Sequence, residues 1–225
     1  VKDIDAFVRH LGEHYGIPVD NMVVMAHSVG AVTVAVWVHD YAPPIRALIL
    51  GTPAFRVRLY VPLAIPLLRL RQALLGSGYV KSYVKARMLT HDPVEAERYR
   101  QDPLIFRQIA VNILLDLHDT STRLLRDAGA IHAPTLVLGA GADWVVKLSA
   151  QRRFFEGLAS PVKEMRVYPG FYHAIFHERD RRLPIEKARE FIRERFRHPP
   201  RRLSLLGADT SGPTYAEYES LRSPS

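Results

Sequence analysis

Apolar residues along the chain fall into two kinds of pattern. Short apolar runs are typical of parallel strands covered on both faces. Three continuous runs and one mixed run predict strands at 22–25, 47–50, 135–138 and 164–168. Longer apolar or amphipathic stretches predict helices at 4–15, 31–38, 147–158 and 184–196. Strands that alternate with helices predict an α/β fold, with a mostly parallel sheet flanked by helices.

Residues 52–130 differ from the rest, because no strand pattern appears in them. We expect a helical cap there, inserted into a core made by 1–51 and 131–198, with a hinge at Gly76-Ser77-Gly78. Residues 199–225 are rich in Pro, Arg, Ser and Gly and show little periodicity, which predicts a linker towards a further domain.

The first predicted strand runs directly into Ala26-His27-Ser28-Val29-Gly30. A serine between small residues, after a strand and before a helix, is the pattern of a nucleophile elbow, which lifts the serine hydroxyl above the sheet. Small residues are expected on both sides of Ser28 because the tight turn brings backbone segments close together. The motif alone is a weak signal, since serine between small residues also occurs by chance.

Two further residues complete a catalytic pattern. A serine hydroxyl needs a base to take its proton, and the base needs a carboxylate to orient it. Asp143 follows the strand at 135–138, and His173 follows the strand at 164–168. The carboxyl ends of parallel strands meet at one edge of a sheet, where ligands bind. The chain order Ser28, Asp143, His173 therefore predicts a Ser–acid–His triad.

Other roles remain open for these side chains. Asp143 by itself also suits the N-cap of the helix that follows it, and Asp116 or Asp119 could serve as the acid instead. His173 by itself could be an ordinary loop histidine, because the chain contains 10 histidines. His27 is expected to pack beside the site, since adjacent side chains on an elbow diverge.

Composition narrows the chemistry further. The chain has 225 residues, of which 48% are hydrophobic, enough for one sizeable core with an insertion. It contains no cysteine, which excludes disulfides and cysteine nucleophiles and fits a reducing, cytoplasmic compartment. No apolar run is long enough to span a membrane. The chain begins at Val1 rather than Met, so a targeting peptide could precede it. No metal or cofactor is expected, because His173 and His177 lack further ligands at suitable spacing.

The net charge of +8 comes from one segment of the chain. No acidic residue occurs between Asp40 and Asp92, and eight basic residues lie there: Arg46, Arg56, Arg58, Arg69, Arg71, Lys81, Lys85 and Arg87. A cationic cap predicts peripheral contact with an anionic membrane surface, although the arginines could simply solvate the outside of the cap. The closing helix alternates arginine with glutamate, so no nucleic-acid partner is expected.

With these residues the chain resembles the α/β-hydrolase superfamily, in its lysophospholipase and monoacylglycerol-lipase branch, which is related to serine aminopeptidase-like hydrolases. The resemblance implies Ser28 as nucleophile, Asp143 as acid, His173 as base and the backbone N–H of Val29 as an oxyanion-hole donor. It also implies a serine esterase that cleaves acyl-lipid-like carboxylic esters. The alternatives are a peptidase or amidase with the same triad, and a non-catalytic hydrolase-like module.

Longer blocks resemble a narrower bacterial group, in which a hydrolase is fused to a class I SAM-dependent methyltransferase. The blocks are His27–Val32, Trp37–Pro43, Pro53–Val57, Leu59–Pro62 and Gly170–His173. Residues 205–221 resemble the junction to the second domain. Sheets of the superfamily have more strands than the four expected here. The resemblance therefore implies that the N-terminal strands and the second oxyanion donor are absent, and that these residues alone are poorly soluble and nearly inactive.

Overall fold

The computed structural model describes residues 1–76 and 78–198; the expected linker at 199–225 and Ser77 of the expected hinge lie outside the described residues. All four strands predicted at 22–25, 47–50, 135–138 and 164–168 are confirmed, and they form one sheet in the order β1-β2-β5-β6. Their bounds are β1 (Val23–His27), β2 (Ala47–Gly51), β5 (Thr135–Ala140) and β6 (Lys163–Tyr168). Every pairing between them is parallel, as predicted.

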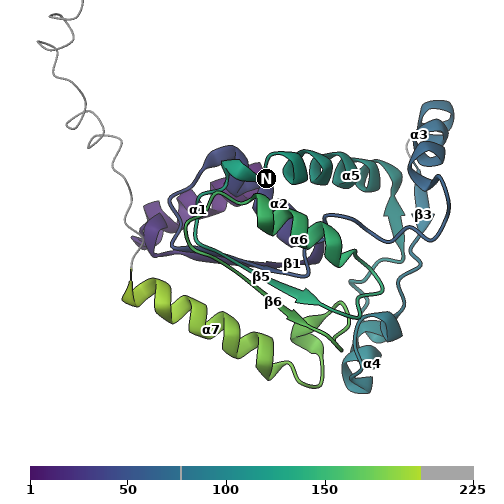
Figure 1. The fold of residues 1–225 in the computed structure, drawn as a ribbon. Helices are drawn as coiled ribbons and strands as arrows, with labels where there is room; N and C mark the ends of the chain where they lie inside the picture. The colour runs from purple at the N-terminus through teal and green to yellow at the C-terminus, as the bar shows by residue number, and fades with distance from the viewer. Residues whose placement is uncertain (77, 199–225) are drawn as a thin grey trace, which may run out of the picture.

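Helices cover both faces of this sheet (Figure 1). Successive residues of β2 point to opposite faces, so Leu48 and Leu50 join one buried cluster while Ala47 and Ile49 join the other. The first cluster is covered by α1 (Lys2–Tyr15), α2 (Ser28–Tyr41), α5 (Val111–Arg126) and α6 (Leu148–Gly157). The second is covered by α7 (Arg182–Arg197). The predicted parallel sheet flanked by helices is confirmed.

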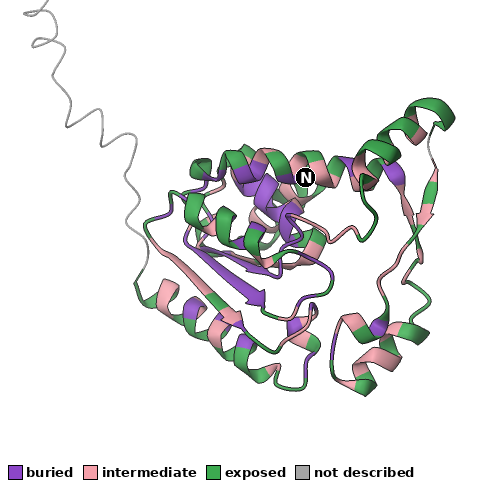
Figure 2. Cartoon of the chain, turned by 45° about the vertical axis from the view of Figure 1, so that its right-hand side comes forward, coloured by how far each residue is buried: buried purple, intermediate pink, exposed green. Residues whose placement is uncertain are grey.

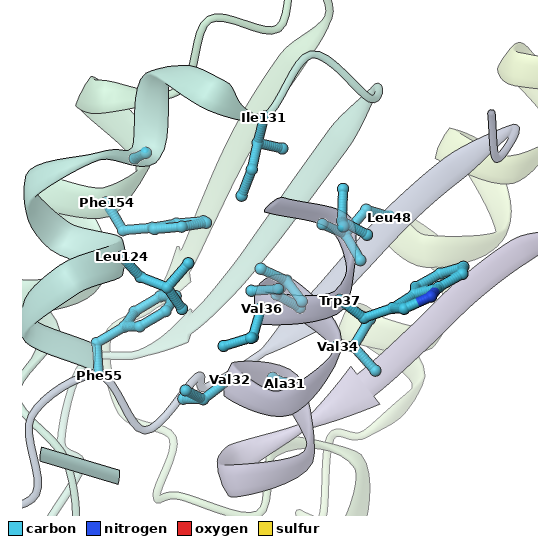
Figure 3. Close-up of a cluster of buried hydrophobic side chains, with 14 of the residues drawn as sticks. Ala31, Val32, Val34, Val36, Trp37, Leu48, Phe55, Leu124, Ile131 and Phe154 are labelled. Atoms are coloured by element: carbon cyan, nitrogen blue, oxygen red, sulfur yellow. The ribbon is translucent and has the colours of Figure 1, made fainter. Parts of the chain in front are cut away.

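The larger of the two clusters is centred on α2. Figure 3 shows Val32 and Val36 of this helix facing Phe55, Leu124 and Phe154, which come from three distant segments of the chain. The rings of Phe55 and Phe154 stack with their centroids 4.3 Å apart. Because α2 is apolar on all sides and largely buried, it fixes the position of the turn that precedes it.

The insertion is largely helical, as expected, but it also contains short strands that were not predicted. Its elements are α3 (Ala64–Leu75), β3 (Tyr79–Lys81), α4 (Pro93–Gln101), β4 (Gln108–Ala110) and the start of α5. β3 and β4 pair antiparallel, with Tyr79 opposite Ala110. Strands of three residues are too short to show an alternating pattern, which is why the sequence did not reveal them.

Helix α5 contributes to both the insertion and the core. Leu124 and Leu125, near its end, belong to the core cluster; Leu114 and Leu117 line a cavity beside α3, and Leu117 also packs against the core cluster. The core therefore receives side chains from the end of the segment expected to form the cap. Buried residues concentrate in β2, β5 and α2, while α3 has no buried residue along its length (Figure 2). Within the described ranges, no helix is both long and apolar enough to cross a bilayer.

Candidate active site

Ser28 occupies the turn between β1 and α2. Its φ of 55° lies in the left-handed region, which is unfavourable for a residue with a side chain. Strain of this kind costs on the order of 1–3 kcal/mol and is typical of functional sites. The expected requirement for a small residue at Gly30 is not visible, because a Cβ at Gly30 would meet no heavy atom of the described chain within 4 Å.

Three side chains form a hydrogen-bonded row at the carboxyl end of the sheet. The Oγ of Ser28 lies 2.8 Å from Nε2 of His173, and Nδ1 of His173 lies 2.9 Å from Oδ2 of Asp143. His173 is 4% exposed and Asp143 is 5% exposed. The structure therefore brings the three predicted residues together, in the geometry that a nucleophile, a base and an orienting carboxylate require.

The second carboxylate oxygen of Asp143 is also occupied. Its Oδ1 accepts hydrogen bonds from the backbone N–H groups of Val145 at 2.7 Å and Val146 at 2.9 Å. Asp143 does not cap α6, whose N-cap residue is Lys147. The backbone thus holds one oxygen of Asp143 while the other faces His173.

The two aspartates considered as alternative acids lie outside this row. Asp116 and Asp119 are exposed on α5, and Asp119 pairs with Arg69 at 2.6 Å. A surface pair of this kind contributes little to stability. Asp143, and not either alternative, is the carboxylate that contacts Nδ1 of His173.

Close packing of two turns explains how Asp143 reaches His173. A Cβ on Gly141, in the turn after β5, would lie 2.4 Å from the backbone oxygen of Pro169, in the turn after β6. Gly141 N–H donates to the carbonyl of Tyr168 at 2.8 Å, and Ala142 N–H donates to that of Phe171 at 3.1 Å. Only glycine allows this approach, so Gly141 is needed to join the two turns.

Sequence reasoning missed Glu178, which links the insertion to the turn that carries His173. This carboxylate is 2% exposed and accepts hydrogen bonds from Nδ1 of His91 at 2.8 Å and from the N–H of Tyr172 at 2.9 Å. Thr90 also donates its hydroxyl to the carbonyl of His177 at 2.7 Å. Nothing in the local sequence distinguishes Glu178 from its exposed acidic neighbours.

Two cavities lie near this edge of the sheet, and neither is lined by Ser28. The smaller, about 200 Å³, lies between the insertion and the loop after β2. Its apolar lining includes Leu59, Ile65, Leu68, Leu114 and Leu117. The larger, about 890 Å³, lies between β6 and α7 on the other side of the turn that carries His173. Across 1–76 and 78–198, no three His, Asp or Glu side chains are grouped to hold a metal ion.

His27 is nearly enclosed beside this row. Its Nε2 lies 3.0 Å from the main-chain oxygen of His173, and the two imidazole ring centroids are 5.0 Å apart. Burial, followed by the charge of His173, lowers the pKa of His27 from 6.5 to about 4. Because a carbonyl only accepts hydrogen bonds, the neutral His27 ring carries its proton on Nε2. Through it the ring donates a hydrogen bond to the backbone carbonyl oxygen of His173.

This low pKa makes the stability of the fold depend on pH. In the unfolded chain His27 binds a proton near pH 6.5, but in the folded protein it does so only near pH 4. The free energy of unfolding is therefore unaffected by the titration of this residue above pH 6.5 and falls as the pH drops towards 4. We expect an acid-induced loss on the order of 3 kcal/mol from this residue. His27→Gln should lose less stability than the parent between pH 7 and pH 4.5 in urea unfolding. Equal losses in the two proteins would contradict the prediction.

Comparison with known proteins places the chain among hydrolases. A family model described as "Serine aminopeptidase, S33" matches residues 1–180. Over 214 residues the chain is 47% identical to "Uncharacterized protein YnbC" of Escherichia coli (strain K12), an alignment that covers 95% of the chain and 37% of that protein. The chain thus spans less than half the length of this relative.

More distant relatives include lipases. The chain is 23% identical over 198 residues to a monoacylglycerol lipase of Mycolicibacterium smegmatis, covering 85% of the chain and 71% of the lipase. The crystal structure of Paleococcus ferrophilus monoacylglycerol lipase superposes with a TM-score of 0.75 at 22% identity, covering 85% of the chain and 73% of that structure. A likeness at this identity shows a shared fold.

Proposed function

Because the chain belongs to the serine aminopeptidase S33 family and has the α/β-hydrolase fold, we propose that it is a serine hydrolase that cleaves carboxylic esters of acyl lipids. The observation that carries this proposal is the row formed by Ser28, His173 and Asp143. The 2.8 Å between Ser28 Oγ and His173 Nε2 allows direct proton transfer from the serine to the histidine, and the 2.9 Å between His173 Nδ1 and Asp143 Oδ2 allows the carboxylate to orient the ring.

The proposed reaction proceeds through an acyl-enzyme. Ser28 Oγ attacks the ester carbonyl while Nε2 of His173 takes its proton, and Asp143 stabilises the imidazolium through Nδ1. The backbone N–H of Val29 donates a hydrogen bond to the developing oxyanion. The carbonyl re-forms as His173 protonates the departing alkoxide, which leaves as the alcohol. Water, deprotonated by His173, then releases the carboxylic acid and restores Ser28.

The choice of an acyl-lipid ester rests on the apolar surroundings of the site. The lining of the 200 Å³ cavity is mostly apolar and includes four leucines and one isoleucine, and the N–H of Ala54, one of its lining residues, donates to the carbonyl of Ser28. An apolar cavity that is connected to Ser28 through the backbone of Ala54 suits an alkyl chain. The monoacylglycerol lipases among the relatives support the same substrate class.

A peptidase or amidase would use the same side chains, and the description of the matching family favours it as the second candidate. The test is to incubate the full protein with a fluorophosphonate probe, map the adduct, and compare hydrolysis of a monoacylglycerol with that of an aminoacyl p-nitroanilide. Labelling of Ser28 with a higher kcat/KM for the ester supports the proposal. Higher kcat/KM for the anilide favours the peptidase. Absence of labelling and of both activities favours a non-catalytic module.

We further propose that the insertion contacts anionic membranes, chiefly through α3. Leu63, Leu67, Leu70 and Leu74 recur at intervals of three or four residues and are 54–73% exposed, so they form one apolar stripe along the helix. Eight basic residues lie between Asp40 and Asp92, and four of them donate hydrogen bonds to other groups of the protein: Arg46, Arg56, Arg58 and Arg69. Lys81, Lys85 and Arg87 are exposed near the stripe in sequence and would attract anionic lipid.

Replacing Leu70 and Leu74 together with glutamate is expected to weaken binding to phosphatidylglycerol vesicles at least about 10-fold, because burial of leucine contributes about 1.5–3 kcal/mol per side chain. Co-sedimentation with vesicles measures the effect. Leu183→Glu, at an equally exposed leucine on α7, is the matched control. The parent should also bind neutral vesicles less, and bind less as salt rises. Equal binding to both vesicle types would favour a merely solvated cap surface.

We also propose that this hydrolase is fused to a class I methyltransferase domain, as in the bacterial group that it resembles. Its support is the resemblance of residues 205–221 to a domain junction, together with the 37% coverage of the E. coli relative.

A further inference from the structure

We propose that Thr52 and His27 are positioning residues, which hold the main chain of His173 so that its imidazole stays between Ser28 and Asp143. The inference rests on the proposed serine hydrolase function. The Oγ1 of Thr52 donates to the His173 carbonyl oxygen at 2.9 Å, and Nε2 of His27 donates to the same oxygen at 3.0 Å. We call this pair of donors the carbonyl clamp.

The clamp is built from the ends of two paired strands. His27 is the last residue of β1 and lies opposite Gly51, the last residue of β2, and Thr52 follows Gly51 directly. A Cβ on Gly51 would lie 2.7 Å from the ring of Phe176, in the turn after His173. Glycine at 51 thus lets the end of β2 approach this turn closely enough for the Thr52 hydroxyl to reach the His173 carbonyl.

The backbone of Thr52 is strained in a way that suits this role. Its φ of 37° lies in the left-handed region, where a β-branched residue is a rare outlier. Thr52 is fully buried, and its N–H donates to the carbonyl of Leu138 at 2.7 Å, which helps to hold the conformation. Strain at a buried residue beside a reactive group is a pointer to function. Here the strained backbone directs the hydroxyl at the His173 carbonyl.

His27 supplies a donor whose charge does not change during the reaction. With a pKa of about 4, it stays neutral in the range in which a catalytic histidine gains and loses its proton. A charged ring 5.0 Å from that of His173 would oppose formation of the imidazolium. A neutral donor holds the carbonyl without this repulsion.

Both ends of the His173 residue are therefore constrained. The side chain is held by Ser28 and Asp143, and the carbonyl by Thr52 and His27. Loss of one clamp donor would leave the ring hydrogen bonds possible but less well aligned. A displacement of about 1 Å in a catalytic group can cost on the order of 10²-fold in rate.

The test compares Thr52→Val with Thr52→Ser in the full protein. Valine keeps the volume and the β-branching but removes the donor, whereas serine keeps the hydroxyl. We expect Thr52→Val to lower kcat by about 10- to 100-fold with KM nearly unchanged, and Thr52→Ser to keep most of the activity. The fluorophosphonate labelling rate should fall in parallel while the adduct stays on Ser28. The acidic limb of the kcat/KM profile should move to lower pH, because a displaced imidazolium is less well stabilised by Asp143.

His27→Phe and His27→Gln form a second pair, in which only glutamine can donate to the carbonyl. Thermal unfolding of all four variants separates the clamp from a purely structural role. Equal kcat and labelling rates for Thr52→Val and the parent would overturn the proposal. So would equal impairment of the valine and serine variants.

If the parent protein itself neither reacts with the probe nor hydrolyses esters, the proposed function fails. In that case the carbonyl clamp is tested by NMR titration of His173. Thr52→Val should shift the midpoint of the titration, and Thr52→Ser should not.

Discussion

Ser28→Ala is expected to lower kcat for ester hydrolysis by on the order of 10⁵–10⁶-fold, with little change in KM. Alanine removes only Oγ, the atom that lies 2.8 Å from Nε2 of His173 and that would form the acyl-enzyme. The backbone should be unaffected, since alanine and serine meet the same penalty at a φ of 55°. A small residual rate over water is expected from the remaining oxyanion donor and from substrate binding.

Steady-state kinetics and probe labelling measure this loss. Ser149→Ala is the matched control, because Ser149 is an exposed serine on α6 and should retain full activity. Thermal unfolding should show that both variants remain folded. If Ser28→Ala kept activity within tenfold of the parent, Ser28 would not be the nucleophile.

Asp143→Asn is expected to lower kcat by about 10⁴-fold. The amide oxygen can still accept from the N–H groups of Val145 and Val146, so the turn should keep its shape. The amide nitrogen would then face Nδ1 of His173 and donate to it. Nδ1 could no longer carry the proton, so Nε2 would carry it instead, and His173 could not accept the proton of Ser28.

Kinetics of the asparagine variant across pH 6–9 test this prediction, since a wrong tautomer is not corrected by changing pH in that range. Asp119→Asn provides the control and also tests the alternative acid, because Asp119 is exposed and pairs with Arg69. It should retain parental activity. An active Asp143→Asn together with an inactive Asp119→Asn would transfer the role of the acid to Asp119.

Local chemistry explains why much of the site could be predicted from the sequence. Within the run at 22–25, Met22 and Val24 pack with the cluster centred on α2 and Val23 packs against the cluster on the other face, and this apolar pattern is visible in the sequence alone. The elbow at Ser28 is a turn between two elements that are adjacent in the chain. Asp143 and His173 each follow a strand directly, and parallel strands bring their carboxyl ends to one edge. These features depend on neighbours in the chain and on one rule of topology.

Contacts between distant segments account for what the sequence did not reveal. Thr52 and His173 are 121 residues apart, His27 and His173 are 146 apart, and His91 and Glu178 are 87 apart. No periodicity or motif links such pairs, so a threonine after a strand or a glutamate in a charged turn looks ordinary.

The sequence by itself thus determined the strands of the parallel sheet, the elbow and the order of the three polar residues, because these follow from local periodicity and turn chemistry. Only the tertiary structure decided which groups hold them. The approach of Gly51 to Phe176 and the hydrogen bond from Thr52 to His173 exist because the chain closes around the sheet. The exposure of the leucines on α3 was settled in the same way, since an apolar helical pattern looks the same whether its surface is buried or free.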